Sequence, residues 1–182
     1  MMEKVVILSF SGRNNGNCRH ITDIIEQYHG NVQYFCINDR FKPCNGCDYE
    51  CLKPGLQCPG FDETQKEVFD AILGADMVYY LIPNFCGFPA ASFCAFNERS
   101  VGYFNGDRGI MGQYLSVKKR FIIVSNSENA VFAAAVRQQT KDEPDVLYLK
   151  TSKYRKQSLA GDLMESEEAR ADLMAFLNAV AI

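Results

Sequence analysis

The sequence has no surplus of positive charge. Its 182 residues contain 19 lysines and arginines against 22 aspartates and glutamates, which gives a net charge of −3. Proteins that bind nucleic acids present a basic face to the phosphate backbone, so this balance argues against nucleic acid as a partner. Histidine is also scarce. Of the two histidines, His20 falls in a predicted helix and His29 directly follows it, and we expect both on the helix surface rather than as metal ligands or bases.

Long apolar runs are missing as well. No stretch of about 18 consecutive apolar residues occurs, so the sequence predicts no membrane-spanning helix and no membrane partner. The first residues lead straight into a strand pattern and lack the charged, apolar and small-residue regions of a secretion signal. No repeat, low-complexity stretch or linker divides the chain. We therefore expect one cytoplasmic domain over residues 1–182 with a full-sized core.

What the sequence does contain is an alternation of strand-like and helix-like segments. Apolar, β-branched runs predict strands, and apolar residues at three- and four-residue spacing predict helices. The predicted strands cover residues 4–9, 32–37, 77–82, 118–125 and 145–150, and the predicted helices cover residues 17–28, 64–73, 90–100, 129–140 and 165–180. This alternation predicts an α/β fold, a flavodoxin-like, doubly wound parallel sheet of five strands in the order 2-1-3-4-5.

Two further segments lie between these elements. The glycine-rich residues 101–117 are typical of a loop, which we expect to contact a partner subunit. Lys118, Lys119 and Arg120 follow at the start of the fourth predicted strand. We expect these three side chains to form a solvated charge cluster.

A polar segment with glycines follows the first predicted strand and precedes the first predicted helix. The free N–H groups and the macrodipole of a helix N-terminus favour an anion at this place, and glycines allow close backbone approach. We predict a phosphate site whose donors come from Ser9, Ser11, Arg13, Asn15, Asn17 and Cys18.

Polar loops also follow the third and fourth predicted strands. In the order 2-1-3-4-5 the first and third strands flank the switch point, so their loops meet in one crevice. A planar ring there would lie along Pro83, Asn84, Phe85, Cys86 and Gly87, in the loop 83–89, with Ser125 and Asn126 of the loop 125–127 beside it. A phosphate site next to a ring site describes a mononucleotide such as FMN.

Eight cysteines are many for a chain of this length. Inside a cell they indicate metal, redox chemistry or buried thiols rather than a disulfide framework. Four of them lie in an irregular loop over about residues 38–62, inserted after the second predicted strand, with the spacing C-x2-C-x3-C-x6-C: Cys44, Cys47, Cys51 and Cys58. These four thiolates could bind a [4Fe–4S] cluster. Structural zinc, or thiols that are reduced or disulfide-paired without metal, are the alternatives.

Four segments together resemble the NAD(P)H-dependent FMN reductase superfamily, and most closely its iron–sulfur flavoprotein branch. Residues 11–18 are similar to its G-S-P-R-x-x-G-N-[ST] motif, and residues 82–87 to its S-P-V-Y-F-G loop. Residues 96–99 are similar to F-x-[DN]-R, and residues 161–170 to its C-terminal segment. The chain departs from the family at Phe10, at Cys18 and by one extra residue between Cys47 and Cys51.

The resemblance implies a homodimer or homotetramer that binds FMN and, through the four cysteines, a [4Fe–4S] cluster. It implies an FMN-dependent oxidoreductase that takes hydride from NAD(P)H and passes electrons to a small or protein acceptor. A non-enzymatic flavodoxin-like electron carrier is one alternative. A binding protein that keeps the fold without the cofactor is another, because a fold does not decide function.

Overall fold

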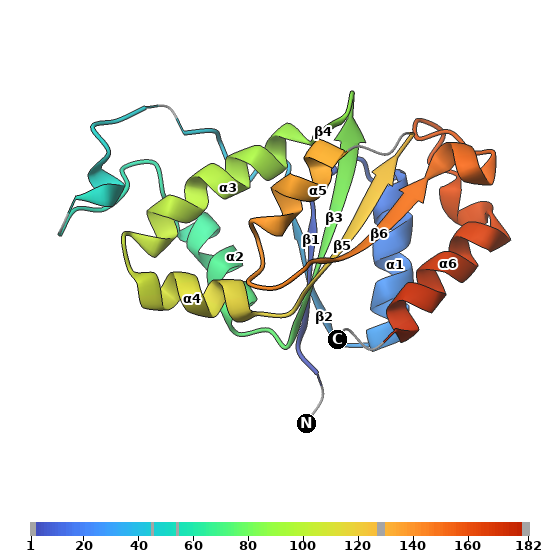
Figure 1. The fold of residues 1–182 in the computed structure, drawn as a ribbon, viewed down its shortest axis with the longest axis horizontal. Coiled ribbons are helices and arrows are strands. Elements are labelled where there is room, and N and C mark those ends of the chain that lie inside the picture. Colours follow the sequence, from blue (N-terminus) through green and yellow to red (C-terminus); the bar gives the residue numbers. More distant parts are fainter. Residues whose placement is uncertain (1–2, 45, 54, 127–129, 180–182) are drawn as a thin grey trace.

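The computed structural model describes residues 3–179 except residues 45, 54 and 127–129. Five parallel strands form a sheet in the order β2-β1-β3-β5-β6 (Figure 1). They are β1 (Val5–Ser9), β2 (Val32–Cys36), β3 (Met77–Phe85), β5 (Lys119–Ser125) and β6 (Asp145–Lys150). A short strand, β4 (Phe88–Pro89), pairs with β3 beside this path. Counted without β4, the order is 2-1-3-4-5, so the predicted flavodoxin-like, doubly wound sheet is confirmed.

Helices cover both faces of the sheet (Figure 1). On one face lie α1 (Asn17–His29) and α6 (Glu167–Asn178). The other face carries α2 (Glu63–Leu73), α3 (Ala91–Phe104), α4 (Arg108–Ser116) and α5 (Ala130–Arg137). Short 3₁₀ turns are formed by Glu50–Leu52, Thr151–Tyr154 and Leu163–Glu165. None of the helices in the described part of the chain has the length and apolar character needed to cross a membrane.

Alternate residues of the central strands face opposite layers of helices. In β1, Val6 and Leu8 belong to the core under α2 and α3, whereas Val5 and Ile7 belong to the core under α1 and α6. This is the two-residue period of a strand. Because both layers are apolar, a central strand shows a continuous apolar run, which is why the sequence located β1 to within one residue.

The segment 83–89, which we predicted as a loop, is a β-hairpin. β3 continues to Phe85, and Phe88–Pro89 form β4, which pairs antiparallel with it. The turn consists of Cys86 and Gly87, whose φ angles are 52° and 87°. Two positive φ angles are typical of a type I′ turn, whose twist matches that of the paired strands. The loop prediction was wrong because a two-residue strand is too short to show a period.

Residues 101–117, also predicted as a loop, are helical for most of their length. α3 continues to Phe104, and α4 begins after a turn in which Asn105 has a φ of 45°. The Asp107 carboxylate accepts hydrogen bonds from the N–H groups of Gly109 and Ile110, at 2.7 and 3.1 Å, and so caps α4. Glycines inside these helices obscured the helical pattern in the sequence.

The basic triplet at the start of β5 is not the solvated cluster that we expected. Only Lys118 is exposed, whereas Lys119 and Arg120 are buried and donate to carbonyl groups at the ends of α4 and α6. His29 also differs from its predicted surface position. Its Nε2 lies 3.0 Å from the Tyr79 hydroxyl, and burial lowers the pKa of its imidazole. Segments distant in the sequence pack over these side chains, so Lys119 and Arg120 are buried and His29 is partly buried.

Candidate functional site

The segments that follow β1, β3, β5 and β6 lie at the carboxyl edge of the sheet (Figure 1). The Asn84 amide, near the end of β3, donates to Ser125 Oγ at the end of β5 at 2.8 Å. Asn126 Oδ1 accepts hydrogen bonds from the hydroxyls of Thr151 and Ser158, and the Ser158 bond measures 2.8 Å. These hydrogen bonds join the predicted segment after β3 to the predicted segment after β5. They also join the segment after β5 to a further one after β6, which was not predicted as part of the site. Residue 127 of the predicted third loop lies outside the described residues.

The loop after β1 lies at the N-terminus of α1. Arg13 and Asn15 are exposed, and Ser9 is buried where the loop begins. Ser9 Oγ forms hydrogen bonds of 3.4 Å with the backbone of Ser11. The helix follows Gly16, which offers no side-chain acceptor to the first-turn N–H groups. These groups and the positive end of the helix dipole suit an anion.

Helix capping distinguishes the two helices at the predicted crevice. α2, α4 and α6 each begin with a side-chain cap, from Asp62, Asp107 and Ser166. α1 and α3 begin at Gly16 and Ala90 without one. Of the α-helices whose N-caps the structure describes, only these two lack a side-chain cap, and they follow β1 and the hairpin. Both N-termini therefore keep donors for a ligand at the switch point.

Packing explains the two departures from the family motif. Phe10 is 1% exposed, and its ring lies 5.2 Å from that of Phe93 and 5.7 Å from that of Phe96. It fills the core beneath the loop, a space that a glycine would leave empty. Cys18 is also buried, and burial raises the pKa of its thiol to about 12, against the smaller opposing effects of Ser11 and Arg13 nearby. The Cys18 thiol therefore stays protonated at neutral pH.

A segment that was not among the predicted site loops closes over the loop after β1. We call residues 151–163 the strap. Arg13 Nη2 donates to the Leu159 carbonyl at 2.8 Å, and Asn17 Oδ1 accepts from the N–H of Leu163 at 3.0 Å. Asn17 is 5% exposed, so its side chain holds the strap while its backbone N–H lies in the first turn of α1. Ligands of doubly wound folds bind beyond the carboxyl ends of the strands, and the strap meets this condition because it follows the carboxyl end of β6.

Gly161 fixes the strap against the loop, and its replacement by alanine should separate them. Its φ is 76°, and a Cβ on it would overlap the carbonyl oxygen of Asn15. We expect Gly161→Ala to lower the free energy of unfolding by about 2 kcal/mol, measured by urea denaturation. Gly112→Ala is the control, because its Cβ would meet nothing within 4 Å in α4. Equal stability of the two variants would contradict this role of Gly161.

The hairpin presents aromatic side chains beside the loops. Phe85 and Phe88 pair across the two strands, and each is 62% exposed. Cys86, at the turn, is exposed as a free thiol. Exposed aromatic pairs on a short hairpin are available for contact with a planar ring. The predicted ring-contacting residues therefore lie at the same edge as the predicted phosphate loop.

The cysteine-rich loop is anchored by α3. Arg99 is buried and donates to the carbonyls of Lys42 and Pro43, both at 2.8 Å, and to Cys58 Sγ at 3.7 Å. Its guanidinium thus joins the entrance and the exit of the loop. Gly102 makes this packing possible, because a Cβ there would lie 2.9 Å from the Cβ of Cys58.

The four clustered cysteines are not arranged as a metal site. All four are described, yet no group of three or more Cys, His, Asp or Glu side chains in the described residues could hold a metal ion. Burial raises the pKa of Cys51, and the neighbouring thiol of Cys58 adds to this effect. The thiols are therefore neighbours without a preformed coordination shell. The structure does not support the predicted [4Fe–4S] cluster, and we derive no chemistry through one.

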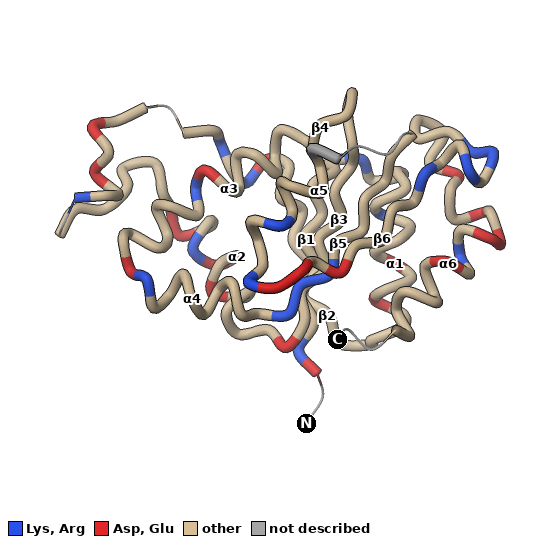
Figure 2. Tube along the Cα trace, in the orientation of Figure 1, with Lys and Arg blue, Asp and Glu red and all other residues tan. Residues whose placement is uncertain are grey.

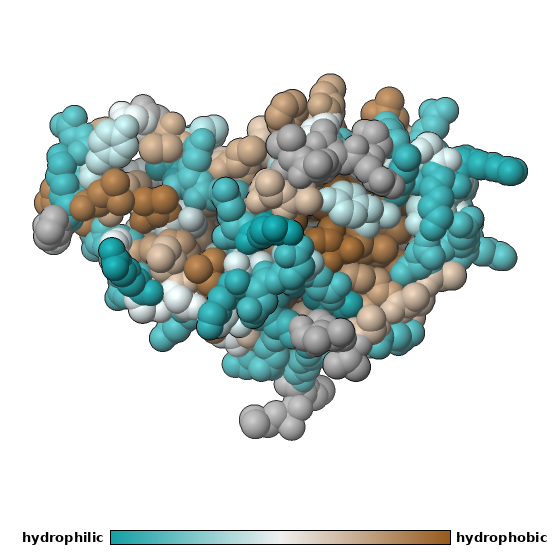
Figure 3. All heavy atoms as spheres, in the orientation of Figure 1, coloured by the Kyte–Doolittle hydropathy of each residue, from teal (hydrophilic) through white to brown (hydrophobic). Residues whose placement is uncertain are grey.

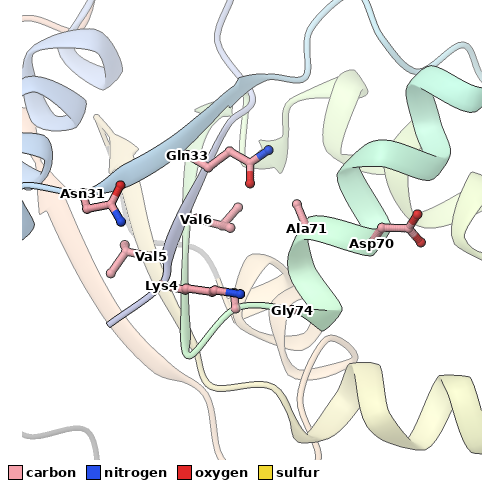
Figure 4. A pocket seen from close by; sticks show the side chains of 9 residues that line it. Lys4, Val5, Val6, Asn31, Gln33, Asp70, Ala71 and Gly74 are labelled. Carbon is pink, nitrogen blue, oxygen red and sulfur yellow. The ribbon is translucent and has the colours of Figure 1, made fainter. Parts of the chain in front are cut away.

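Two cavities lie away from the carboxyl edge of the sheet. One of about 340 Å³ lies at the amino end of β1, where Figure 4 shows Lys4, Gln33 and Asp70 around it. The other, of about 240 Å³, is lined by Leu52 and Val101, where apolar side chains gather over the cysteine-rich loop, α3 and α4 (Figure 3). Neither cavity is lined by any of the predicted site residues, and we assign them no function.

Comparison with known proteins identifies the fold but no close relative. No protein-family model matches the sequence, and a search of curated proteins finds no match. Solved structures do match over nearly the whole chain. The fold is flavodoxin-like.

Three of these structures carry informative names. A putative quinone reductase from Klebsiella pneumoniae is 14% identical, with a TM-score of 0.62 over 98% of this chain and 86% of that chain. The flavoenzyme NAD(P)H:(acceptor) oxidoreductase FerB from Paracoccus denitrificans is 12% identical, with a TM-score of 0.58 over 97% and 96%. General stress protein 14 from Treponema denticola, in complex with FMN, is 12% identical, with a TM-score of 0.56 over 97% and 98%. At this level of identity the likeness establishes the fold.

Proposed function

We propose that this chain is an FMN-dependent oxidoreductase that takes hydride from NAD(P)H. The observation that carries the proposal is the meeting of the loop after β1, the hairpin and Ser125–Asn126 at the switch point of the sheet, where α1 and α3 begin without side-chain caps. Structures of the same fold include one named as an NAD(P)H:(acceptor) oxidoreductase and one in complex with FMN. These names support the choice of cofactor and of hydride donor.

The residues at this edge fit a flavin mononucleotide. The phosphate would be held by Ser11, Arg13 and Asn15, by the first N–H groups of α1, and by the loop that Ser9, Asn17 and Cys18 position from buried sites. The ring would lie along the hairpin residues Pro83, Asn84, Phe85, Cys86 and Gly87, with Ser125 and Asn126 beside it. Exposed phenylalanine rings and a helix N-terminus without a side-chain cap suit the two ends of this ligand.

When bound, FMN supplies the redox chemistry, which is the acceptance of hydride from a reduced nicotinamide and the release of electrons to an acceptor. The protein contributes binding and orientation. Hydride transfer between the two rings requires no side-chain acid or base, so we assign none. The homodimeric or homotetrameric state and the cytoplasmic location expected from the sequence remain predictions, as does the identity of the electron acceptor.

Removing the Arg13 guanidinium should weaken FMN binding through its phosphate. We expect Arg13→Gln to raise the Kd for FMN about 10-fold, because one charge-assisted hydrogen bond to a phosphate is lost. Riboflavin, which has the same ring and no phosphate, should bind both proteins within about 2-fold. Flavin fluorescence quenching measures both values. Absence of FMN binding, or equal weakening for both ligands, would overturn the assignment of the phosphate site.

The reaction is tested with the FMN-loaded protein under anaerobic conditions. Bleaching of the flavin absorbance on addition of NADPH or NADH alone is the expected result. Bleaching that requires a reduced partner protein would identify an electron carrier instead. A protein that takes up no flavin would be the cofactor-free binding protein of the same fold.

A further inference from the structure

The strap and the residue before it carry a group of positive charges. Residues 150–156 contain Lys150, Lys153, Arg155 and Lys156, and Figure 2 shows blue segments of the chain at and beyond the end of β6. Lys153 and Lys156 form ion pairs of 2.6 and 3.2 Å with carboxylates of α6 and of the strap. Lys150 and Arg155 form no ion pair with any residue that the structure describes. Two of the four charges are therefore available to an external anion.

The backbone presents Arg155 in a defined turn. Its φ is 55°, in the left-handed region that residues other than glycine adopt rarely and often at functional sites. Its N–H donates to the Ser152 carbonyl at 3.3 Å, and the next N–H donates to the Thr151 carbonyl at 3.0 Å. The side chain is exposed. The turn thus holds a free guanidinium at the surface.

This turn is attached to the candidate site. Ser152 Oγ donates to the Asn126 carbonyl at 3.3 Å, and Thr151 and Ser158 donate to the Asn126 side chain. Asn126 is one of the residues expected beside the flavin ring. The free charges therefore lie beyond the ring site on the β6 side, whereas the loop after β1 has its own donors for the FMN phosphate. A second anion, different from the FMN phosphate, suits this position.

We propose that Arg155 and Lys150 bind the 2′-phosphate of NADPH and make the site selective for NADPH over NADH. The two nucleotides differ only in this group, which carries nearly two negative charges at neutral pH. Arginine binds phosphate through two parallel hydrogen bonds, and an arginine near the ribose is a common device for accepting the 2′-phosphate. The inference rests on the proposed oxidation of a reduced nicotinamide.

Kinetics with both nucleotides tests the proposal. For the FMN-loaded protein, we expect Arg155→Gln and Lys150→Gln each to lower kcat/KM for NADPH about 10-fold, through KM, and to change kcat/KM for NADH less than about 2-fold. Lys153→Gln is the matched control, because it removes a charge from the same turn that is already paired with Asp172. It should change neither value by more than about 2-fold. Equal use of both nucleotides by the unaltered protein, or equal losses for both in the variants, would overturn the proposal.

Calorimetry separates this inference from the proposed function. 2′,5′-ADP should bind the unaltered protein about 10-fold more tightly than 5′-AMP, and Arg155→Gln should abolish the difference. If neither NADPH nor NADH is oxidised, the proposed function fails, whereas this preference for 2′,5′-ADP still supports the phosphate site. If the two ligands bind equally, the phosphate site is wrong whatever the kinetics show.

Discussion

Replacing Arg120 by methionine is expected to lower the free energy of unfolding by about 3 kcal/mol. The Arg120 side chain is 1% exposed, and its Nε donates to Oδ2 of Asp145 at 2.6 Å. The same guanidinium donates to the carbonyls of Phe176 and Leu177 and lies 3.9 Å from the centre of the Phe176 ring. Its loss would leave the C-terminal carbonyls of α6 without their cap. Asp145 is partly exposed, so water can solvate it and the loss stays below the upper limit for a broken buried pair.

Arg137→Met is the matched control for this prediction. Arg137 forms an ion pair of the same length, 2.6 Å, with Glu143, but both side chains are more than half exposed. Exposed pairs contribute little, so we expect a change below about 1 kcal/mol. Urea denaturation followed by circular dichroism measures both variants. Similar losses in the two would show that burial of Arg120 does not determine its contribution.

Lys119 should make the stability of the protein depend on pH between about 7 and 10.5. Its side chain is 4% exposed, and burial lowers the pKa of its amine to about 7. Nζ donates to the carbonyls of Tyr114 and Val117 and lies 4.2 Å from the centre of the Tyr114 ring. No carboxylate among the described residues forms an ion pair with it. The folded chain therefore releases a proton that the unfolded chain keeps until about pH 10.5.

The direction follows from this difference in proton binding. Between the two pKa values unfolding takes up a proton, so the free energy of unfolding rises with pH, and below pH 7 the folded state carries the full cost of a buried charge. Between pH 6.5 and 9.5 the unaltered protein should gain about 3 kcal/mol relative to Lys119→Met. Comparison with the variant cancels the contributions of groups that both proteins share.

Lys118→Met controls for the loss of a lysine at this position. Lys118 is exposed and adjacent in sequence, so the stability difference between this variant and the unaltered protein should stay constant over the same pH range. Urea denaturation at several pH values gives both differences. A constant difference for Lys119→Met as well would show that the Lys119 amine is charged in the folded state throughout.

Local patterns in the sequence were sufficient to predict the five parallel strands and to locate the first loop of the candidate site. The apolar run of β1 ends at Ser9 and is followed by glycines and polar residues before a helix. In any doubly wound fold this succession indicates a loop at the edge of the sheet where ligands bind. The sheet order then places the segment after β3 beside it. Those inferences need only two things. One is the periodicity of apolar side chains, which neighbouring residues reveal, and the other is the general right-handedness of crossover connections.

Contacts between distant segments decided the rest. Lys119 and Arg120 had the composition of a solvated cluster, and only the packing of α4 and α6 over them made them buried helix caps. The strap reaches the loop after β1 through Arg13 and Asn17, across more than 140 residues of chain. The cysteine spacing allowed a cluster, yet the geometry of the described thiols offers no metal site. The sequence by itself determined the five parallel strands and their order, and it predicted the phosphate loop, because these inferences follow from local periodicity. Tertiary structure alone decided which charges are buried and which segments complete the site, because burial and long-range hydrogen bonds depend on partners that no local pattern contains.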